Sequence, residues 1–467
     1  MKMWSGRARL PLDPEFEQWQ RSFVFDKRLL AHEIAASRAH ARALARIGVL
    51  STTELAALLQ ALDRIQLSLE RDPQFLDDSE AEDVHHFLER RLVEFAGDAG
   101  LKLHAGRSRN EQIATDLRLF VRATIDEIHV HLLSFLEALA AKAQAAGDAA
   151  MPAHTHLQPA EPVLVAHWLL AYAEMLLRDH SRLSDCRARL NFCPLGSGAV
   201  AGATLPIDRD AISRDLEFTA PSANSIDATS DRDFAVEFVQ SLAVLGTHLS
   251  RWAEEMIVFS TREFGWVRLP EAYSTGSSAM PQKMNPDALE LIRGKSARLV
   301  GAATALLVTI KSLPLAYNKD LQETQEPVFD AAATAIESLK HAAGVMRSCE
   351  FDLARMSAAA QLGFMNAMAA ATYLSRKRIP FRSAHKIVGK AVSHCLQQGC
   401  ELGDLSLEQL RQFSPEFDQD FYSAITLDAV LGCHDVAGGT APARVHSALQ
   451  QIQQSISALQ EALHAHA

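Results

Sequence analysis

Residues 231–264 have the sequence DRDFAVEFVQSLAVLGTHLSRWAEEMIVFSTREF, and this segment decides the fold class of the chain. Its apolar side chains recur at intervals of three and four residues, which is the period of one buried face of an α-helix. They are Phe234, Phe238, Leu242, Leu245, Leu249, Trp252 and Met256. At about 1.5 Å per residue, a helix of this length spans roughly 50 Å. The segment therefore predicts one long helix with a single apolar stripe.

The same period continues in four other long segments, at 116–146, 162–191, 286–311 and 322–346. Helices of this length usually pack along one another in a bundle. No strand-like alternation extends beyond a few residues. We therefore predict an all-α protein whose middle third is a bundle of long helices.

Shorter helices are predicted on either side of this bundle. Two lie at 33–47 and 53–69, and Ser51-Thr52-Thr53-Glu54 supplies a cap before the second. After residue 355, short helices alternate with turns. These changes predict an N-terminal helical domain (1–104), a central long-helix domain with the polar loops (105–355) and a small helical C-terminal domain (356–467).

The composition narrows the class of protein. Hydrophobic residues make up 48% of the 467 residues and charged residues 22%, which is typical of a soluble globular chain. A formal net charge of -11 disfavours a surface for the nucleic-acid backbone. The six cysteines have neither metal-site spacing nor the density of a disulfide scaffold, which indicates reduced thiols. With no signal peptide or membrane-spanning stretch in the sequence, we expect a cytoplasmic protein that binds neither nucleic acid nor membrane.

The segment GSSAMPQKMNPD, residues 276–287, is the first of three polar segments at predicted helix ends. Gly276 and the two serines give a flexible loop, and Asn285 and Pro286 predict the N-cap and the first position of a helix. Lys283 and the positive end of that helix then suit a carboxylate or a serine oxyanion. A surface turn that caps a helix is the alternative. The serine of a hydrolase elbow is excluded, because no glycine follows two places later.

The second polar segment, HAGRSRNEQ at 104–112, precedes the helix predicted from residue 116. Its two guanidiniums, hydroxyl and amide match planar carboxylates. Two arginines at a helix N-terminus also oppose the helix dipole, which favours ligand contacts over a solvated helix end.

The third polar segment, MPAHTHLQP at 151–159, contains His154 and His156. Their spacing suits a metal ion, but no third ligand stands nearby in the sequence. The alternative is a purely structural role, which is the usual role of a single histidine in a loop. Two histidines among hydroxyl and amide groups favour acid–base chemistry or substrate contacts.

Residues 276–285 fill every fixed position of Gly-Ser-Ser-x-Met-Pro-x-Lys-x-Asn, so the chain resembles the fumarase/aspartase superfamily. Within that superfamily it resembles the argininosuccinate lyase (δ-crystallin) family over essentially its whole length. The other matching segments are GRSRN (106–110), HTHLQ (154–158), YNKDLQ (317–322), GGTAP (438–442) and, with Ser5 in place of a glycine, WSGR (4–7).

The resemblance implies a three-domain fumarase/aspartase-like fold whose long helices form one bundle shared across a homotetramer. Each active site would then take its three loops from three subunits. The implied activity is that of a carbon–nitrogen lyase without metal or other cofactor. It converts argininosuccinate reversibly to L-arginine and fumarate by β-elimination, a step of arginine biosynthesis.

The family's residue roles carry over onto matching positions. By this resemblance, Ser277 is the base that removes the proton next to a carboxylate, and Lys283 and backbone amides are the candidates to stabilise the alkoxide and the developing carboxylate charge. His156 is the acid or holds the water that acts as acid, and Glu290 pairs with it. The roles of Ser277 and His156 as base and acid stay exchangeable. The positions that match substrate contacts are Ser22, Ser108, Arg109, Asn110, Thr155, Asn285, Tyr317 and Gln322.

Two positions depart from the family pattern. Met284 replaces a basic residue often found after the lysine, at a variable position. Gln325 stands where the family usually has a lysine that contacts the substrate. A lyase that releases fumarate from another N-substituted aspartate is therefore an alternative. A catalytically silent structural relative is a second alternative, disfavoured because the signature residues are intact.

Overall fold

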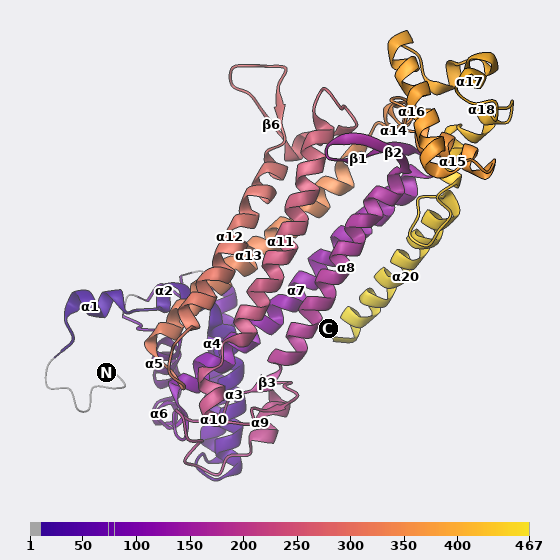
Figure 1. Cartoon of the computed structure of the whole chain (residues 1–467). Helices are drawn as coiled ribbons and strands as arrows, with labels where there is room; N and C mark the ends of the chain where they lie inside the picture. The colour runs from indigo at the N-terminus through magenta and orange to yellow at the C-terminus, as the bar shows by residue number, and fades with distance from the viewer. Residues whose placement is uncertain (1–10, 73, 79, 467) are drawn as a thin grey trace. The chain divides into compact units, whose positions relative to one another are not determined.

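A computed structural model describes residues 11–72, 74–78 and 80–466, and its elements are mostly helices (Figure 1). The predicted all-α class is confirmed. The WSGR segment at 4–7 lies outside the described residues. None of the helices in the described ranges combines the length and apolarity that a bilayer-spanning segment needs.

The five long helices predicted from the sequence are present, with shifted ends. Their bounds are α7 (Arg109–Ala146), α8 (Val165–Leu190), α11 (Asp233–Ser260), α12 (Asp287–Ile310) and α13 (Gln325–Ser348). Every residue of the predicted apolar stripe of α11 is buried. Trp252 of that stripe packs edge-on against Phe135 of α7, with ring centroids 5.0 Å apart. The period of three and four residues therefore identified the buried face correctly.

The chain divides into two compact units, each made of three separate stretches. Unit 1 comprises Met1–Ile128, Ser181–Val244 and Ala297–Ala335, and unit 2 comprises His129–His180, Leu245–Ser296 and Ile336–Ala467. The division falls within each of the five long helices. The division into three consecutive domains stays a prediction.

Unit 1 adds shorter helices to its share of the long ones. They are α1 (Pro14–Trp19), α2 (Phe23–Asp26), α3 (Leu30–Arg46), α4 (Thr52–Arg71), α5 (Val84–Ala96), α6 (Asp98–Lys102), α9 (Arg209–Asp215) and α10 (Ser225–Ser230), with 3-10 turns η1 (Lys27–Leu29) and η3 (Lys319–Thr324). The strands β3 (Phe192–Cys193) and β4 (Ala220–Pro221) pair in parallel. The predicted cap of α4 is confirmed: the Ser51 N–H donates to Glu54 Oε2 (2.9 Å), and the Glu54 N–H donates to Ser51 Oγ (3.3 Å).

Unit 2 contains three antiparallel strand pairs. These are β1 (Ala150–Thr155) with β2 (Gln158–Leu164), β5 (Val267–Arg268) with β8 (Glu350–Phe351), and β6 (Thr275–Gly276) with β7 (Met284–Asn285). The sequence predicts a polar loop at 151–159, and this was wrong, because β1 and β2 form a hairpin there. Each of the two strands contains proline, and its two adjacent apolar residues lie at the end away from the turn. The period-two pattern is therefore weak in the sequence.

The C-terminal part of unit 2 has a small core of its own. Its helices are α14 (Leu353–Ala359), α15 (Ala367–Arg376), α16 (Phe381–Gln398), α17 (Leu407–Phe413), α18 (Phe421–Ala424), α19 (Leu427–Gly432) and α20 (Pro442–His466), with the 3-10 turn η4 (Leu402–Asp404). Leu374, Phe417 and Phe421 are buried together in this core. The predicted alternation of short helices and turns after residue 355 is confirmed.

Candidate functional site

The predicted site residues fall into one group in each unit. Unit 1 holds Ser22, Ser108, Arg109, Asn110, Tyr317, Gln322 and Gln325, and unit 2 holds Thr155, His156, Ser277, Lys283, Asn285 and Glu290. The two groups offer different chemistry. The first is rich in carboxylate-binding groups, and the second contains the predicted acid–base pair.

In unit 1, α7 begins at Arg109, seven residues earlier than the predicted 116. Arg109 and Asn110 therefore lie in the first helical turn rather than in a preceding loop. Ser108 acts as the cap, because its Oγ accepts from the Asn110 N–H at 3.3 Å. Glu111 closes the turn: one of its oxygens accepts from the Ser108 N–H (2.9 Å), and the other accepts from the Gly198 N–H (2.9 Å).

A chain of polar contacts connects Arg109 with Ser22. Arg109 Nη1 donates to Asp83 Oδ2 at 2.9 Å, and Asp83 caps α5. The N–H of the next residue, Val84, donates to Asp26 Oδ1 at 3.0 Å, and Ser22 Oγ donates to Asp26 Oδ2 at 2.6 Å. Burial, followed by the charge of Asp83, raises the pKa of Asp26 to about 7. Two substrate contacts predicted from distant segments thus share one polar cluster.

Arg232 is a functional candidate that the sequence reasoning missed. Its side chain is buried (2% exposed), and its Nη1 donates to the Asp231 carbonyl at 2.8 Å. Its Nε and Nη2 have no hydrogen-bond partner among the described residues. The nearby Tyr317 hydroxyl has its pKa raised by burial, a rise that the Arg232 guanidinium opposes. A buried guanidinium with free N–H groups beside a hydroxyl suits a carboxylate.

The sequence did contain a signal for Arg232. It stands between Asp231 and Asp233, directly before a long apolar stripe, at a helix end where the dipole disfavours a cation. The helical period of the segment predicts its buried face but assigns no role to this arginine.

Gln322 lies in the 3-10 turn η3, and Gln325 is the first residue of α13. Gln322 Nε2 donates to the Gln20 carbonyl at 3.2 Å, and Gln20 Nε2 donates to Glu82 Oε1 at 3.3 Å. Gln325 is 2% exposed, and its Oε1 accepts no hydrogen bond from the described residues. Burial without a partner for this oxygen is costly, which is typical of a position built for a ligand.

In unit 2, Thr155 and His156 lie at the tip of the β1–β2 hairpin, where both side chains are exposed. Thr155 pairs with Gln158, so His156 and Leu157 form a two-residue turn, and both have left-handed backbones (φ 56° and 59°). Such turns normally contain asparagine and glycine, because a β-carbon is strained there. Backbone strain of this kind gathers at functional sites.

The 276–287 segment forms a second, shorter hairpin. Thr275 pairs with Asn285 and Gly276 with Met284, so residues 277–283 form the loop. The prediction of Asn285 as N-cap was wrong by one residue. The Pro286 carbonyl accepts from the N–H groups of the first turn of α12, whereas Asn285 Nδ2 donates to Thr275 Oγ1 at 3.4 Å. Strand pairing holds Asn285 out of the cap position.

Ser277 has a backbone environment suited to negative charge. Its Oγ accepts from the N–H groups of Ala279 (3.3 Å) and Met280 (3.1 Å). Amide donors directed at a serine oxygen lower the free energy of its alkoxide. Among the described residues, no hydrogen bond or ion pair joins Ser277 to Lys283 or His156 to Glu290. Both pairings stay predictions.

The chain is similar to known lyases over its full length. The family model described as "Lyase" matches residues 6–301, and the model described as "Argininosuccinate lyase C-terminal" matches residues 364–432. The argininosuccinate lyase of Koribacter versatilis is 58% identical over 464 residues, 99% of either chain. That of Acidobacterium capsulatum is 59% identical over 458 residues, 97% of this chain and 94% of the relative.

Solved structures share the fold. The structure of EDDS lyase in complex with formate matches with a TM-score of 0.86 at 26% identity, over 98% of this chain and 93% of that chain. A fumarate lyase from Mesorhizobium sp. BNC1 matches with a TM-score of 0.74 at 23% identity, over 94% of this chain and 100% of that chain.

Proposed function

The chain belongs to the argininosuccinate lyase family, and from this premise we propose that it cleaves argininosuccinate reversibly to L-arginine and fumarate. The full-length similarity to argininosuccinate lyases is the observation that carries the proposal. It gives the enzyme a place in arginine biosynthesis as a carbon–nitrogen lyase.

The unit 1 group is the proposed substrate-holding half of the site. Argininosuccinate carries several carboxylates, and each needs donors in fixed positions. Arg109 is held by Asp83, whereas Arg232 keeps Nε and Nη2 without a partner among the described residues. Arg232 with Tyr317 is therefore the proposed carboxylate clamp, and Ser22, Ser108, Asn110 and Gln322 complete the hydrogen-bonding set.

The unit 2 group is the proposed acid–base half of the site. Ser277, as alkoxide, takes the proton from the carbon next to a substrate carboxylate, and the electron pair delocalises into that carboxylate. The N–H groups of Ala279 and Met280 support this role, because they already point at Ser277 Oγ. The carbon–nitrogen bond then breaks as His156 protonates the departing guanidino nitrogen, and fumarate forms.

Lys283, Asn285, Thr155 and Glu290 complete this half as proposed supporting groups. Lys283 supplies positive charge for the alkoxide and for the developing carboxylate charge, and Asn285 and Thr155 contact the substrate. Glu290 tunes His156. Exposure of Lys283, Thr155, His156 and Glu290 in the single chain is consistent with groups that meet their partners only when substrate or other subunits are present.

We propose a homotetramer in which each active site takes loops from three subunits. Support comes from the exposed apolar side chains Val300, Leu307 and Val308 on α12, which are 50%, 45% and 56% exposed. The six free thiols support a cytoplasmic location. Mixing an inactive Ser277→Ala variant with an inactive Arg232→Met variant tests the assembly. Recovery of activity after subunit exchange is expected, and a tetramer that never regains activity would contradict shared sites.

A steady-state assay tests the reaction. The wild-type protein is expected to release fumarate from argininosuccinate, followed by the ultraviolet absorbance of fumarate. No fumarate from argininosuccinate would refute the proposal. A tetramer inactive on every N-substituted aspartate would favour a silent structural relative.

Gln325 motivates the second candidate, a lyase that releases fumarate from another N-substituted aspartate. Its buried side chain replaces a positive charge that the family pattern provides, and its Oε1 lacks a partner within the described part of the chain. The Gln325→Lys variant should raise kcat/KM for argininosuccinate if the lost charge weakens binding. Turnover of another N-substituted aspartate by wild type, with argininosuccinate inert, would favour the second candidate.

A further inference from the structure

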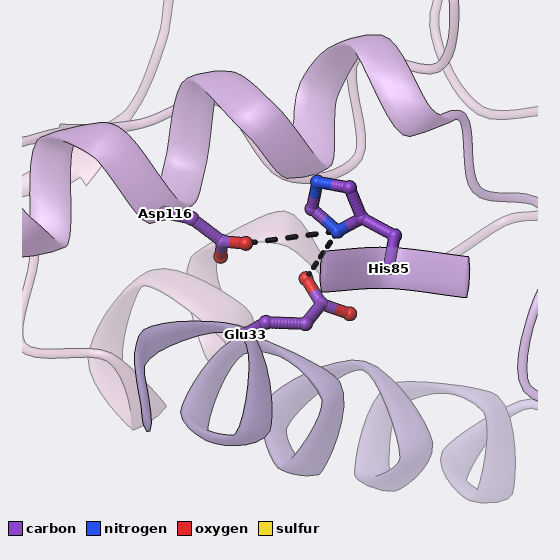
Figure 2. Close-up of side chains that lie close together, drawn as sticks. All are labelled: Glu33, His85 and Asp116. Atoms are coloured by element: carbon purple, nitrogen blue, oxygen red, sulfur yellow. Dashed lines mark hydrogen bonds and ion pairs between the residues drawn. The ribbon is translucent and has the colours of Figure 1, made fainter. Parts of the chain in front are cut away.

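Unit 1 contains a buried polar triad that none of the predicted site residues belongs to. It consists of Glu33 on α3, His85 on α5 and Asp116 on α7, which are 1%, 4% and 0% exposed (Figure 2). His85 Nδ1 lies 3.1 Å from Glu33 Oε2 and 3.7 Å from Asp116 Oδ2. Two carboxyl groups that are buried together need an explanation, because an uncompensated buried charge is costly.

Glu33 has the surroundings of an ionised carboxylate. Ser37 Oγ and Gln112 Nε2 both donate to its Oε1 at 2.8 Å, and Arg107 Nη1 lies 3.4 Å from the same oxygen. Arg107 Nη1 also donates to Ser37 Oγ at 2.9 Å. Burial alone would raise the pKa of Glu33, but Arg107 and His85 outweigh it and hold the pKa below its ordinary value.

Asp116 has the opposite surroundings. Neither of its oxygens accepts a hydrogen bond from a described N–H or hydroxyl group, and its side chain is fully buried. Burial, then the charge of Glu33, raises the pKa of Asp116 well above its ordinary value. When two carboxyl groups share a site, one stays protonated, and the proton belongs on the group without donors. A neutral Asp116 has one O–H to give, and Glu33 is the acceptor beside it.

A metal ion is the alternative occupant, since one ligand atom from each of the three residues lies within 4.8 Å of the others. The Arg107 guanidinium disfavours a second cation there. Ser37 and Gln112 also already direct their donors at Glu33, as donors to an anion do.

The triad touches the substrate-holding half at two points. Arg107 belongs to the 104–112 segment, directly before Ser108 and Arg109. His85 lies two residues after Asp83, which holds Arg109. The position of Glu33 therefore affects the position of the segment that carries Arg109. It also affects the start of α5, where Asp83 orients the Arg109 side chain.

We propose that Asp116 is a neutral carboxylic acid that donates to Glu33, and that the resulting single negative charge, matched to Arg107, positions the 104–112 segment for substrate. Asp116 is thus a positioning residue that never touches the substrate. The kinetic test of this proposal rests on the proposed function, because it measures turnover of argininosuccinate. The spectroscopic test does not depend on the proposed function.

The kinetic test compares two replacements of Asp116. Asp116→Asn keeps an N–H donor toward Glu33, so KM and kcat for argininosuccinate should stay within about threefold of wild type. Asp116→Leu keeps the size but loses the donor, so KM should rise by about tenfold or more, with a smaller change in kcat, because a displaced binding segment costs that much. Equal damage in both variants, or none in either, would overturn the positioning role.

Asp179 provides the matched control. It is also a buried aspartate (1% exposed), and its Oδ2 lies 2.7 Å from His248 Nδ1, in unit 2. The same two replacements at Asp179 should leave KM for argininosuccinate within about threefold of wild type, whatever they do to the melting temperature. If KM rose tenfold in Asp179→Leu as it does in Asp116→Leu, the effect would follow from the loss of any buried aspartate.

A spectroscopic test separates the triad from the reaction. In aspartate-labelled protein at neutral pH, the infrared spectrum of wild type minus that of Asp116→Asn should show a protonated carboxyl band. Asp26, whose pKa is raised to about 7, contributes to both spectra and cancels in the difference. Absence of that band would overturn the neutral acid even if Asp116→Leu fails to fold. Wild-type protein inactive on argininosuccinate, but with the band present, would refute the proposed function and keep the neutral acid. Stabilisation of wild type, but not Asp116→Asn, by zinc would make the triad a metal site instead.

Discussion

Replacing Arg232 with methionine should raise the free energy of unfolding of the protein and remove most of its lyase activity. Burial lowers the pKa of Arg232 from 12.5 to about 10, which corresponds to about 3 kcal/mol of destabilisation at neutral pH. Methionine has a similar length without the charge. It gives up the hydrogen bond to the Asp231 carbonyl, which contributes about 1 kcal/mol. The net expectation is a free energy of unfolding higher by about 2 kcal/mol in the absence of substrate.

The same change should cost most of the activity. Removing one partner of a buried ion pair costs about 3–5 kcal/mol, so kcat/KM for argininosuccinate should fall by at least about a hundredfold. Urea denaturation without ligand measures the first effect, and the fumarate assay measures the second. Arg232→Lys keeps a charge but loses the planar fork, so it should lose activity without gaining stability.

Arg118 is the matched control for stability. It is also buried (5% exposed), but its guanidinium pairs with the Asp231 carboxylate and lies over the Phe234 ring, 4.4 Å from its centroid. Arg118→Met should therefore destabilise the fold, because it leaves Asp231 without its partner. The reasoning would be refuted if Arg232→Met lowered the free energy of unfolding, or kept kcat/KM within tenfold of wild type.

Three further predictions concern single residues. Ser277→Ala should abolish fumarate release while leaving the melting temperature and the oligomeric state unchanged, and a retained rate would remove Ser277 from its assigned role. Burial, then the charge of Arg107, lowers the pKa of His40 to about 3 from 6.5, so the native state resists a proton that the unfolded chain binds. Stability should therefore decline as pH falls from 6.5 toward 3 in urea titrations, and His40→Gln should flatten this decline; an unchanged slope would contradict it. Leu157→Gly should raise the free energy of unfolding by about 0.5–1 kcal/mol by relieving the left-handed turn, and a lower melting temperature would show that the Leu157 side chain itself contributes to stability.

The helical bundle could be predicted because its signal is local. The buried stripe of α11 repeats within one segment, and Ser51 and Glu54 cap α4 from three residues apart. The start of α7 was placed seven residues too late although its cap is local: Glu111 accepts from the Ser108 N–H, and Ser108 Oγ accepts from the Asn110 N–H. The two arginines of this segment favoured a ligand-binding loop over a helix start.

Candidate site residues could be named from the sequence only where a motif marked them. Ser277 and His156 stand in recognisable segments, so both could be proposed although their hairpins were not expected. Arg232 becomes conspicuous only through its burial and the lack of partners for two of its nitrogens among the described residues. Asp116 is likewise a routine helix residue in the sequence, and its meaning comes from Glu33, a neighbour on another helix.

The assembly of unit 1 from three separate stretches affects how the nascent chain can fold during synthesis. This unit needs residues 297–335, so it cannot complete while only the first half of the protein has left the ribosome. The part of α11 that belongs to unit 1 is therefore synthesised before the last stretch of the same unit. Contacts between distant segments also slow folding and prolong the exposure of apolar surface. We therefore expect synthesis of this chain to depend on chaperones that shield nascent helices, more than its helical content alone would suggest.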